Sequence, residues 1–191
     1  ALGGESATLT GAVCDIASRD QVQGVWDHAV AKFGRVDIWV NNAGMSLPRK
    51  PLPEIPADDI QKIVNTNLVG VFNGDAVAMK GMLAQGSGVI IHVSSIQRVL
   101  PLPESTTAYA AAKGALTTYS KALAREVMPK GVRVLSVAPG WIETDMTEGA
   151  RSWDKLREAV VQRPPARRWG RPEDFEGIAA YLASRLCLES L

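Results

Sequence analysis

Tyr109 and Lys113 are the two residues whose types and spacing most directly suggest chemistry in this sequence. They stand four positions apart in an alanine-rich stretch, residues 105–128, which is predicted to be helical, so their side chains share one helix face. A tyrosine has a pKa near 10 and is a poor base at neutral pH, but a neighbouring ammonium favours the phenolate. A pKa lowered by about three units, or roughly 4 kcal/mol, would let Tyr109 exchange a proton with a substrate hydroxyl or carbonyl. The Y-x-x-x-K pattern also arises by chance on amphipathic helices, so the pair alone is weak evidence.

Three further polar clusters directly follow short apolar runs that have the composition of strands. They are residues 41–44 after the run 36–40, Ser94-Ser95 after the run 89–93, and residues 139–144 after the run 132–137. Ligands of parallel sheets gather at the carboxyl ends of the strands, which meet at one edge. The three clusters therefore predict one shared site at that edge.

The elements that must position these residues alternate between strand and helix, and this order predicts an α/β fold with a parallel sheet. Residues 7–14 are predicted to form a first strand. Ser18 and Gln21 predict a capping box at the start of a helix that ends at Gly34. The other predicted helices cover residues 58–83, 105–128, 153–161 and 172–184, and a proline-rich loop covers residues 48–56.

The composition limits the class of protein. The 191 residues, 46% of them hydrophobic, fit one domain with a sizeable core. A net charge of +1 offers no general attraction for nucleic acid or for an anionic membrane. Two cysteines exclude a disulfide scaffold, and no apolar run approaches the roughly 20 residues of a membrane span. We also find no secretory signal at the start of the sequence, so we expect a cytoplasmic protein.

Taken together, the motifs resemble those of the short-chain dehydrogenase/reductase family from about residue 13 to residue 184. The resemblance rests on Asp15 after the first strand, N-N-A-G at 41–44, Asn67 in N-T-N-L-V-G, Ser94-Ser95, Y-A-A-A-K at 109–113, P-G-W-I-E-T-D at 139–145 and R-W-G-R-P-E-D at 168–174. No single motif is decisive, but their order and spacing together are specific. The resemblance implies a Rossmann-like doubly wound parallel sheet and an NAD(P)-dependent oxidoreductase acting on a small alcohol or carbonyl substrate.

The resemblance also implies a role for each catalytic residue. Tyr109 would be the general acid/base, and Lys113 would lower its pKa and hydrogen-bond the nicotinamide ribose. Ser95 would hold the reacting oxygen of the substrate, and Asn67 would anchor a water that links Lys113 to solvent. These roles suit hydride transfer to or from the carbon whose oxygen Tyr109 protonates.

A second set of residues is implied to bind the cofactor, which is NAD or NADP with a preference that we cannot assign from the sequence. Asp15 and Ile16 would contact the adenine, and Ile142 and Thr144 would hold the carboxamide. The complete cofactor-binding set is Asp15, Ile16, Asn42, Ala43, Gly44, Tyr109, Lys113, Pro139, Gly140, Ile142 and Thr144.

Several of these residues also have a purely structural explanation. Asp15 could end a strand, Asn42 could form a turn beside Gly44, and Asn67 could be a surface residue of a helix. Ser94 competes with Ser95 for the place in the site, because the loop to Tyr109 is about one residue longer than is common in the family; we favour Ser95.

Other polar residues give weaker signals. His28 and His92 lie 64 positions apart without a ligand-spaced partner, so we predict no metal site and interpret His92 as a packed strand residue. The arginines around Trp169 are interpreted as a solvated turn rather than a phosphate or nucleic-acid contact. They are Arg163, Arg167, Arg168 and Arg171.

The phosphate-binding loop of the family, T-G-x-x-x-G-x-G, is absent from the sequence, and no G-x-G-x-x-G or Walker A pattern replaces it. We therefore expect residues 1–191 to form a single Rossmann-like domain that lacks the first two strands and the last strand of the family. In a sheet ordered 3-2-1-4-5-6, such a loss separates residues 7–14 from their neighbour and leaves the strand at 36–40 with a bare apolar edge.

Alternative functions belong to other classes. The absent phosphate loop would suit a catalytically inactive remnant that serves as a binding or oligomerisation scaffold, although Asn67, Ser95, Tyr109 and Lys113 are all present. A sugar-nucleotide epimerase or dehydratase also uses Y-x-x-x-K, but N-N-A-G and P-G-W-I-E-T fit dehydrogenases better. A hydrolase using Ser95 fits least, because G-x-S-x-G is missing. For the partners, the resemblance implies a homodimer or homotetramer, with no nucleic acid and no membrane.

Overall fold

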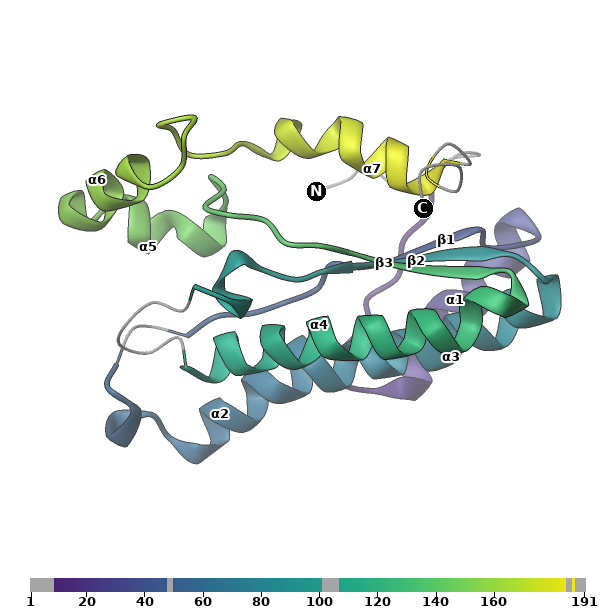
Figure 1. Cartoon of the computed structure of the whole chain (residues 1–191). Helices are drawn as coiled ribbons and strands as arrows, with labels where there is room; N and C mark the ends of the chain where they lie inside the picture. The colour runs from purple at the N-terminus through teal and green to yellow at the C-terminus, as the bar shows by residue number, and fades with distance from the viewer. Residues whose placement is uncertain (1–8, 48–49, 101–106, 185–186, 188–191) are drawn as a thin grey trace.

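The centre of the molecule is a three-stranded parallel sheet, seen edge-on in Figure 1. The computed structural model describes residues 9–47, 50–100, 107–184 and 187. The strands β1 (Ile38–Asn41), β2 (Gly88–Val93) and β3 (Val132–Val137) lie in the order β1-β2-β3. The predicted strand at 132–137 is confirmed, the one at 89–93 begins one residue earlier, and β1 covers 38–41 instead of 36–40. The α/β class and the parallel sheet are therefore confirmed.

Three helices cover one face of this sheet: α1 (Arg19–Phe33), α3 (Gly70–Gln85) and α4 (Thr107–Val127) (Figure 1). Their apolar sides and the sheet bury a common core, in which each fully buried aliphatic side chain contributes about 1.5–3 kcal/mol. Its buried members are Val22, Trp26, Val77, Ala78, Met82, Ile90, Leu123, Val127, Val132 and Val134. The core thus holds α4, with Tyr109 and Lys113, against β2 and β3.

Helix α1 begins as the sequence predicts, but only half of the capping box forms. Ser18 is the N-cap, and its hydroxyl accepts a bond from the Gln21 backbone N–H at 3.5 Å. The Gln21 side chain accepts instead from the Asp15 backbone N–H at 2.8 Å, so it ties down the preceding turn. Gly34 ends the helix with a φ of 84°, a backbone conformation that favours glycine.

The predicted helical stretch at 58–83 is confirmed, and its middle turn is π-helical. The structure has α2 (Ala57–Val64), a π-helical turn (Asn65–Val69) and then α3. Such π-bulges interrupt the regular hydrogen-bond ladder and occur frequently at functional sites. The turn carries Asn67, whose role is described below.

The predicted first strand at 7–14 is also wrong, as far as the structure describes it. Residues 9–14 have no regular secondary structure, and Val13 is fully exposed; residues 7 and 8 lie outside the described part. A strand exists only as a member of a hydrogen-bonded ladder, and in the described residues β1 pairs with β2 alone. Two apolar side chains of β1, Ile38 and Val40, are 42% and 51% exposed.

After β3 the chain forms short helices that lie on the side of the sheet away from α4 (Figure 1). They are α5 (Glu148–Arg151), α6 (Asp154–Gln162) and α7 (Glu176–Ala183), with 3-10 turns at Asp145–Thr147 and Pro172–Phe175. The predicted helix at 172–184 is thus a 3-10 turn followed by α7. Three more 3-10 turns cover Leu52–Glu54, Ile96–Arg98 and Met128–Lys130. The arginine cluster is exposed as predicted, and Arg168 forms a double ion pair with Asp174 at 2.7 and 2.9 Å.

Candidate active site

The two serines after β2 have different surroundings, and only one of them reaches the tyrosine. Ser95 caps the 3-10 turn Ile96–Arg98, where its hydroxyl accepts from the Gln97 backbone N–H at 3.2 Å. The same side chain is hydrogen-bonded to Tyr109. The Ser94 hydroxyl points to α4 instead and donates to the backbone oxygen of Lys113 at 3.2 Å. This geometry favours Ser95 over Ser94 as the serine of the site.

Lys113 is held beneath Tyr109 on the same face of α4. Its Nζ donates to the backbone oxygen of Val93 at 2.7 Å and lies 5.8 Å from the centre of the Tyr109 ring. The residue is only 4% exposed, and this burial lowers the pKa of its ammonium to about 8. At neutral pH the side chain therefore still carries a positive charge.

The pKa of Tyr109 moves in the direction opposite to our expectation. Burial raises it, and the hydrogen bond with Ser95 only partly offsets that rise. The physical reason is that half-buried Tyr109 loses hydration of its phenolate, whereas the Lys113 ammonium is directed at the Val93 carbonyl. In this arrangement the neutral phenol is favoured, which is the form that can donate a proton.

Asn67 lies in the π-helical turn and is completely buried, so its interpretation as a surface residue is wrong. Its side chain makes two bonds to the backbone of Met45: Oδ1 accepts from the N–H at 2.9 Å and Nδ2 donates to the oxygen at 2.8 Å. This pairing fixes the loop after β1. A Cβ on Gly44 would lie 3.0 Å from Asn67 Oδ1 and 3.8 Å from Lys113 Nζ, so the loop passes closely over both side chains.

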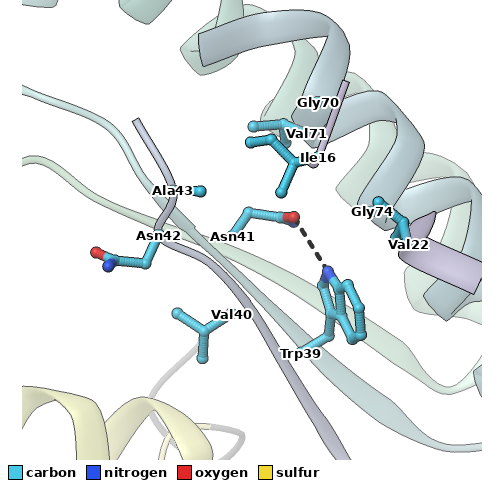
Figure 2. A pocket seen from close by; sticks show the side chains of 10 residues that line it. All are labelled: Ile16, Val22, Trp39, Val40, Asn41, Asn42, Ala43, Gly70, Val71 and Gly74. Carbon is cyan, nitrogen blue, oxygen red and sulfur yellow. Dashed lines mark hydrogen bonds between the residues drawn. The ribbon is translucent and has the colours of Figure 1, made fainter. Parts of the chain in front are cut away.

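Part of the predicted cofactor set lines a pocket beside the end of β1. Ile16, Asn42 and Ala43 belong to its wall (Figure 2), together with Val22, Trp39, Val40, Asn41, Gly70, Val71 and Gly74. Asp15 is not in this wall; its carboxylate accepts from the Ala17 backbone N–H at 2.9 Å and stabilises the turn before α1. Asp15 thus has a structural contact in a turn, but it does not end a strand as the structural explanation had it, because residues 9–14 form none.

The segment after β3 runs beside the serine loop. The Ile96 backbone N–H donates to the Pro139 oxygen at 2.8 Å, which places the ends of β2 and β3 together. Ile142 forms a parallel bridge with Gly170. Thr144 caps the following 3-10 turn, where its backbone N–H donates to the Thr147 hydroxyl at 3.1 Å. Gly140 is exposed on the same segment.

Two features were not predicted: the Met45 backbone as a partner of Asn67, and the network around Asp75. The signal for Asp75 was a lone acidic residue in a helical stretch, residues 68–79, in which Asn73 is the one other polar side chain. His92 is fully buried in β2, so its interpretation as a packed strand residue is confirmed.

In the part of the chain that the structure describes, no group of three His, Cys, Asp or Glu side chains is arranged to hold a metal ion. Within the same ranges, no helix is both long and apolar enough to cross a membrane.

The parallel sheet and the helices that cover it define a Rossmann-like α/β protein, in which Ser95, Tyr109 and Lys113 lie together. The family model described as "Enoyl-(Acyl carrier protein) reductase" matches residues 2–187. The chain belongs to the short-chain dehydrogenase/reductase family.

Curated relatives and solved structures agree with this assignment. The chain is 37% identical to the 3-oxoacyl-[acyl-carrier-protein] reductase FabG of Thermotoga maritima, over 90% of this chain and 68% of that protein. It is 38% identical to a 2-dehydro-3-deoxy-D-gluconate 5-dehydrogenase of Pseudoalteromonas atlantica, over 90% and 66%. A gluconate 5-dehydrogenase from Burkholderia cenocepacia, solved with NADP and tartrate, superposes with a TM-score of 0.85 at 35% identity, over 91% and 67%. The chain thus spans about two thirds of the length of these relatives.

Proposed function

We propose that the protein is an NAD(P)-dependent oxidoreductase that interconverts a small alcohol and the corresponding carbonyl compound, with Tyr109 as the general acid/base. The observation that carries the proposal is the hydrogen-bonded pair of Ser95 and Tyr109, with the Lys113 ammonium 5.8 Å from the tyrosine ring. The reacting oxygen of such a substrate needs a hydroxyl donor, a phenol that exchanges protons and a buried cation nearby.

Each of the three side chains has a distinct role in this proposal. Ser95 donates a hydrogen bond to the reacting oxygen and fixes its position next to Tyr109. During reduction Tyr109 gives its hydroxyl proton to the carbonyl oxygen, and during oxidation the phenolate takes the proton of the alcohol. Lys113 stabilises the phenolate, because its ammonium is desolvated and its field is little screened by water. The upward direction of the Tyr109 pKa suits the donating role in reduction.

The residues around the site fit a nicotinamide dinucleotide in part. The pocket of Ile16, Asn42 and Ala43 would hold the adenosine end, and the close passage of Gly44 over Lys113 leaves the lysine beside the ribose of the nicotinamide. The remaining members of the proposed set are Asp15, Pro139, Gly140, Ile142 and Thr144. When bound, the nicotinamide supplies or accepts the hydride. Relatives have been solved with NADP and with NAD+, so either cofactor is consistent with the proposal.

The substrate class and the assembly extend the proposal. The relatives are named for 3-oxoacyl thioester and sugar-acid chemistry, which share a hydroxyl–carbonyl pair, so a small-molecule alcohol or carbonyl compound is proposed here. A homodimer or homotetramer formed through α3 and α4 belongs to the proposal, and the partly exposed Phe72 of α3 supports it. The alternative of an inactive scaffold has no support from the comparisons, since these relatives are named as enzymes. We keep the cytoplasm as the proposed location.

Replacing Tyr109 by phenylalanine tests the function directly. Tyr109→Phe keeps the ring and removes only the hydroxyl, so turnover should fall by about 10²–10⁴ while the binding of NADH or NADPH, followed by fluorescence, is unchanged. Tyr181→Phe on α7 removes a hydroxyl from an exposed tyrosine and serves as the control. Turnover of Tyr109→Phe within threefold of the wild type would exclude Tyr109 from the mechanism.

A further inference from the structure

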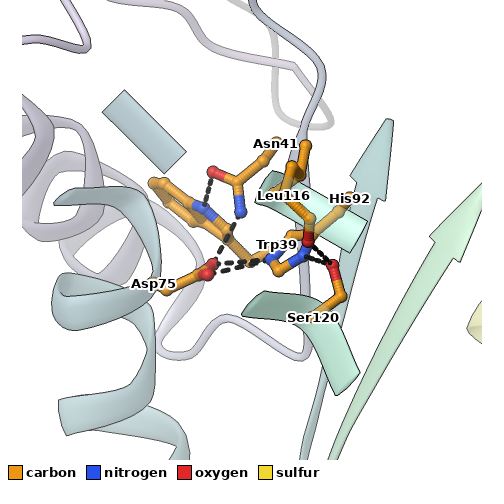
Figure 3. A network of polar contacts seen from close by, with 6 residues as sticks. All are labelled: Trp39, Asn41, Asp75, His92, Leu116 and Ser120. Carbon is orange, nitrogen blue, oxygen red and sulfur yellow. Dashed lines mark hydrogen bonds and ion pairs between the residues drawn. The ribbon is translucent and has the colours of Figure 1, made fainter. Parts of the chain in front are cut away.

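A second polar cluster lies inside the core, and it takes no part in the proposed chemistry. Asp75 of α3, His92 of β2 and Ser120 of α4 come together between the sheet and the helices (Figure 3). Asp75 and His92 have no exposed surface, and Ser120 is 5% exposed. Asp75 and His92 have no surface that water can reach, so their hydrogen bonds must be satisfied within the protein.

The surroundings of Asp75 consist of hydrogen-bond donors. Its Oδ1 accepts from Asn41 Nδ2 at 2.7 Å, and His92 Nε2 lies 3.1 Å from Oδ1 and 2.9 Å from Oδ2. Oδ2 makes no hydrogen bond of good geometry, so its approach to His92 Nε2 is an ion-pair contact by distance alone. The Tyr119 hydroxyl is also hydrogen-bonded to Asp75; burial and the carboxylate raise the pKa of Tyr119, which keeps it a neutral donor. The donors at Oδ1, Asn41 Nδ2 and His92 Nε2, favour the ionised carboxylate.

The proton count at His92 follows from Ser120. The single hydroxyl hydrogen of Ser120 goes to the Leu116 backbone oxygen at 2.6 Å, so Ser120 can only accept at its contact with His92 Nδ1, which is 2.7 Å long. Nδ1 must therefore carry a proton. Nε2 faces an ionised carboxylate that has no proton to give, so Nε2 must donate as well. The ring that satisfies all these contacts is the imidazolium.

We infer that Asp75 and His92 form a buried ion pair that acts as a positioning device, holding β2 against α4 so that Lys113 stays at the Val93 carbonyl. This inference rests on the proposed function of Lys113 beside Tyr109.

The connection to the site runs through adjacent residues. His92 directly precedes Val93, whose backbone oxygen accepts from Lys113 Nζ at 2.7 Å. Ser120 follows Lys113 by seven residues, or two helical turns, so both side chains leave α4 on the face that meets β2. α4 is thus attached to two consecutive residues of β2 by two polar contacts, one in the core and one in the site.

Asn41 brings a third element into the same cluster. It directly precedes Asn42 of the proposed cofactor pocket, and its Oδ1 accepts from Trp39 Nε1 at 3.0 Å while its Nδ2 serves Asp75. The ion pair therefore fixes the end of β1 as well as β2 and α4.

The energetics agree with a positioning role rather than a stabilising one. Burying two charges costs more than their attraction commonly returns, so apolar residues would serve stability as well. Removing one partner, however, leaves the other charge buried and uncompensated, which forces the local structure to rearrange. A misplacement of about 1 Å at a catalytic group can lower turnover by up to about 100-fold.

The ionisation state can be measured without any turnover. The sequence has two histidines, so His28→Gln leaves His92 as the one source of ring signals in a 15N-labelled sample. Two-bond 1H–15N spectra at pH 7 should show both ring nitrogens protonated, and His28→Gln/Asp75→Asn should show one. A single protonated nitrogen in the His28→Gln protein would overturn the ion pair.

The positioning role is tested by variants of the pair. His92→Gln leaves the Asp75 charge unpaired and should lower kcat by about 10–100-fold, with KM changed less than threefold. Asp75→Asn/His92→Gln replaces the ions by two amides that can make the same bonds, and should return kcat to within about threefold of the wild type. Val127→Ala, fully buried at the far end of α4, is the control for lost stability without a change at Lys113.

The outcomes separate this inference from the proposed function. If His92→Gln lowers the melting temperature like Val127→Ala but keeps kcat, or if the double variant is no better than His92→Gln, the positioning role is wrong. If His92→Gln fails to fold, the kcat of the double variant and the ring spectra still decide. If Tyr109→Phe keeps full activity, the proposed function fails, while the ring spectra still report on the pair.

Discussion

The polar group at the end of the sheet and the polar group inside the core share the same two elements, β2 and α4, yet they differ in access. Ser95 and Tyr109 meet at the carboxyl edge of the sheet, where Tyr109 is half-buried and Lys113 lies beneath it. His92 and Ser120 meet deeper along the same strand and helix, where they are 0% and 5% exposed. Ser95 and Lys113 are 7% and 4% exposed, so the difference in access lies in Tyr109.

The difference teaches that residue type does not assign a function. Asp75, His92 and Ser120 have the composition of a hydrolytic triad, but only 5% of the Ser120 surface is exposed. Its hydroxyl also donates to a backbone oxygen rather than to the histidine. Tyr109, by contrast, lies at the carboxyl edge of the sheet and is only half-buried. The expected consequences of substitutions therefore differ between the two groups.

The largest effect is expected at Lys113. Lys113→Met keeps much of the side-chain volume but removes the ammonium that stabilises the Tyr109 phenolate, so turnover should fall by about 10²–10⁴. Lys121→Met on the exposed side of α4 is the matched control and should leave turnover within about twofold. Steady-state kinetics on both variants makes the comparison. Equal losses in both would mean that the buried ammonium has no special role.

The buried ammonium should also make stability depend on pH. The pKa of Lys113 is about 8 in the folded chain against 10.5 for the free side chain, so between these values the unfolded chain binds more protons. The free energy of unfolding should therefore rise with pH from about 8 to 10.5, by up to about 3 kcal/mol. Urea unfolding of the wild type and of Lys113→Met across this window gives the difference, because only the wild type carries the titrating group. Parallel curves would contradict the burial effect.

The two serines provide a sharper test of access. Ser95→Ala removes the hydroxyl that faces Tyr109 and should reduce turnover by about 100-fold with little change in stability. Ser94→Ala removes the bond to the Lys113 backbone oxygen, so it should cost about 1–2 kcal/mol of unfolding free energy and change turnover less than about threefold. Kinetics and thermal unfolding of both variants are needed. The reverse pattern would place Ser94 in the site.

The smallest effect is expected for an ion pair on the surface. Arg35 and Asp37 lie 2.5 Å apart, with about half or more of each side chain exposed. Arg35→Ala should change the free energy of unfolding by less than about 1 kcal/mol, because water screens the pair. Urea unfolding at low and high salt measures this. A loss as large as that of His92→Gln would remove the contrast between buried and exposed charges.

Much of this organisation could be predicted from local patterns. The runs 89–93 and 132–137, the cap at Ser18 and the helix containing Tyr109 and Lys113 are encoded by apolar periodicity and by capping residues within a few positions. The grouping of the polar clusters at one edge follows from parallel topology alone. The family motifs then indicate which of these residues belong to the site.

Other features depend on contacts between distant segments. The π-helical turn contains Asn67, whose side chain pairs with the Met45 backbone 22 positions away. The choice between Ser94 and Ser95 depends on which hydroxyl faces α4. The strand expected at residues 7–14 does not form in its described part, because a strand needs a neighbouring ladder that its own sequence cannot supply.

The sequence by itself determined the α/β class, the order of the elements and the residue types available at the sheet edge, since these depend on periodicity and spacing along the chain. The tertiary structure decided burial, and burial set the pKa directions of Tyr109 and Lys113 and placed Asp75 and His92 in contact. The physical reason is that desolvation and hydrogen-bond partners depend on residues that are distant in sequence, which no local pattern specifies.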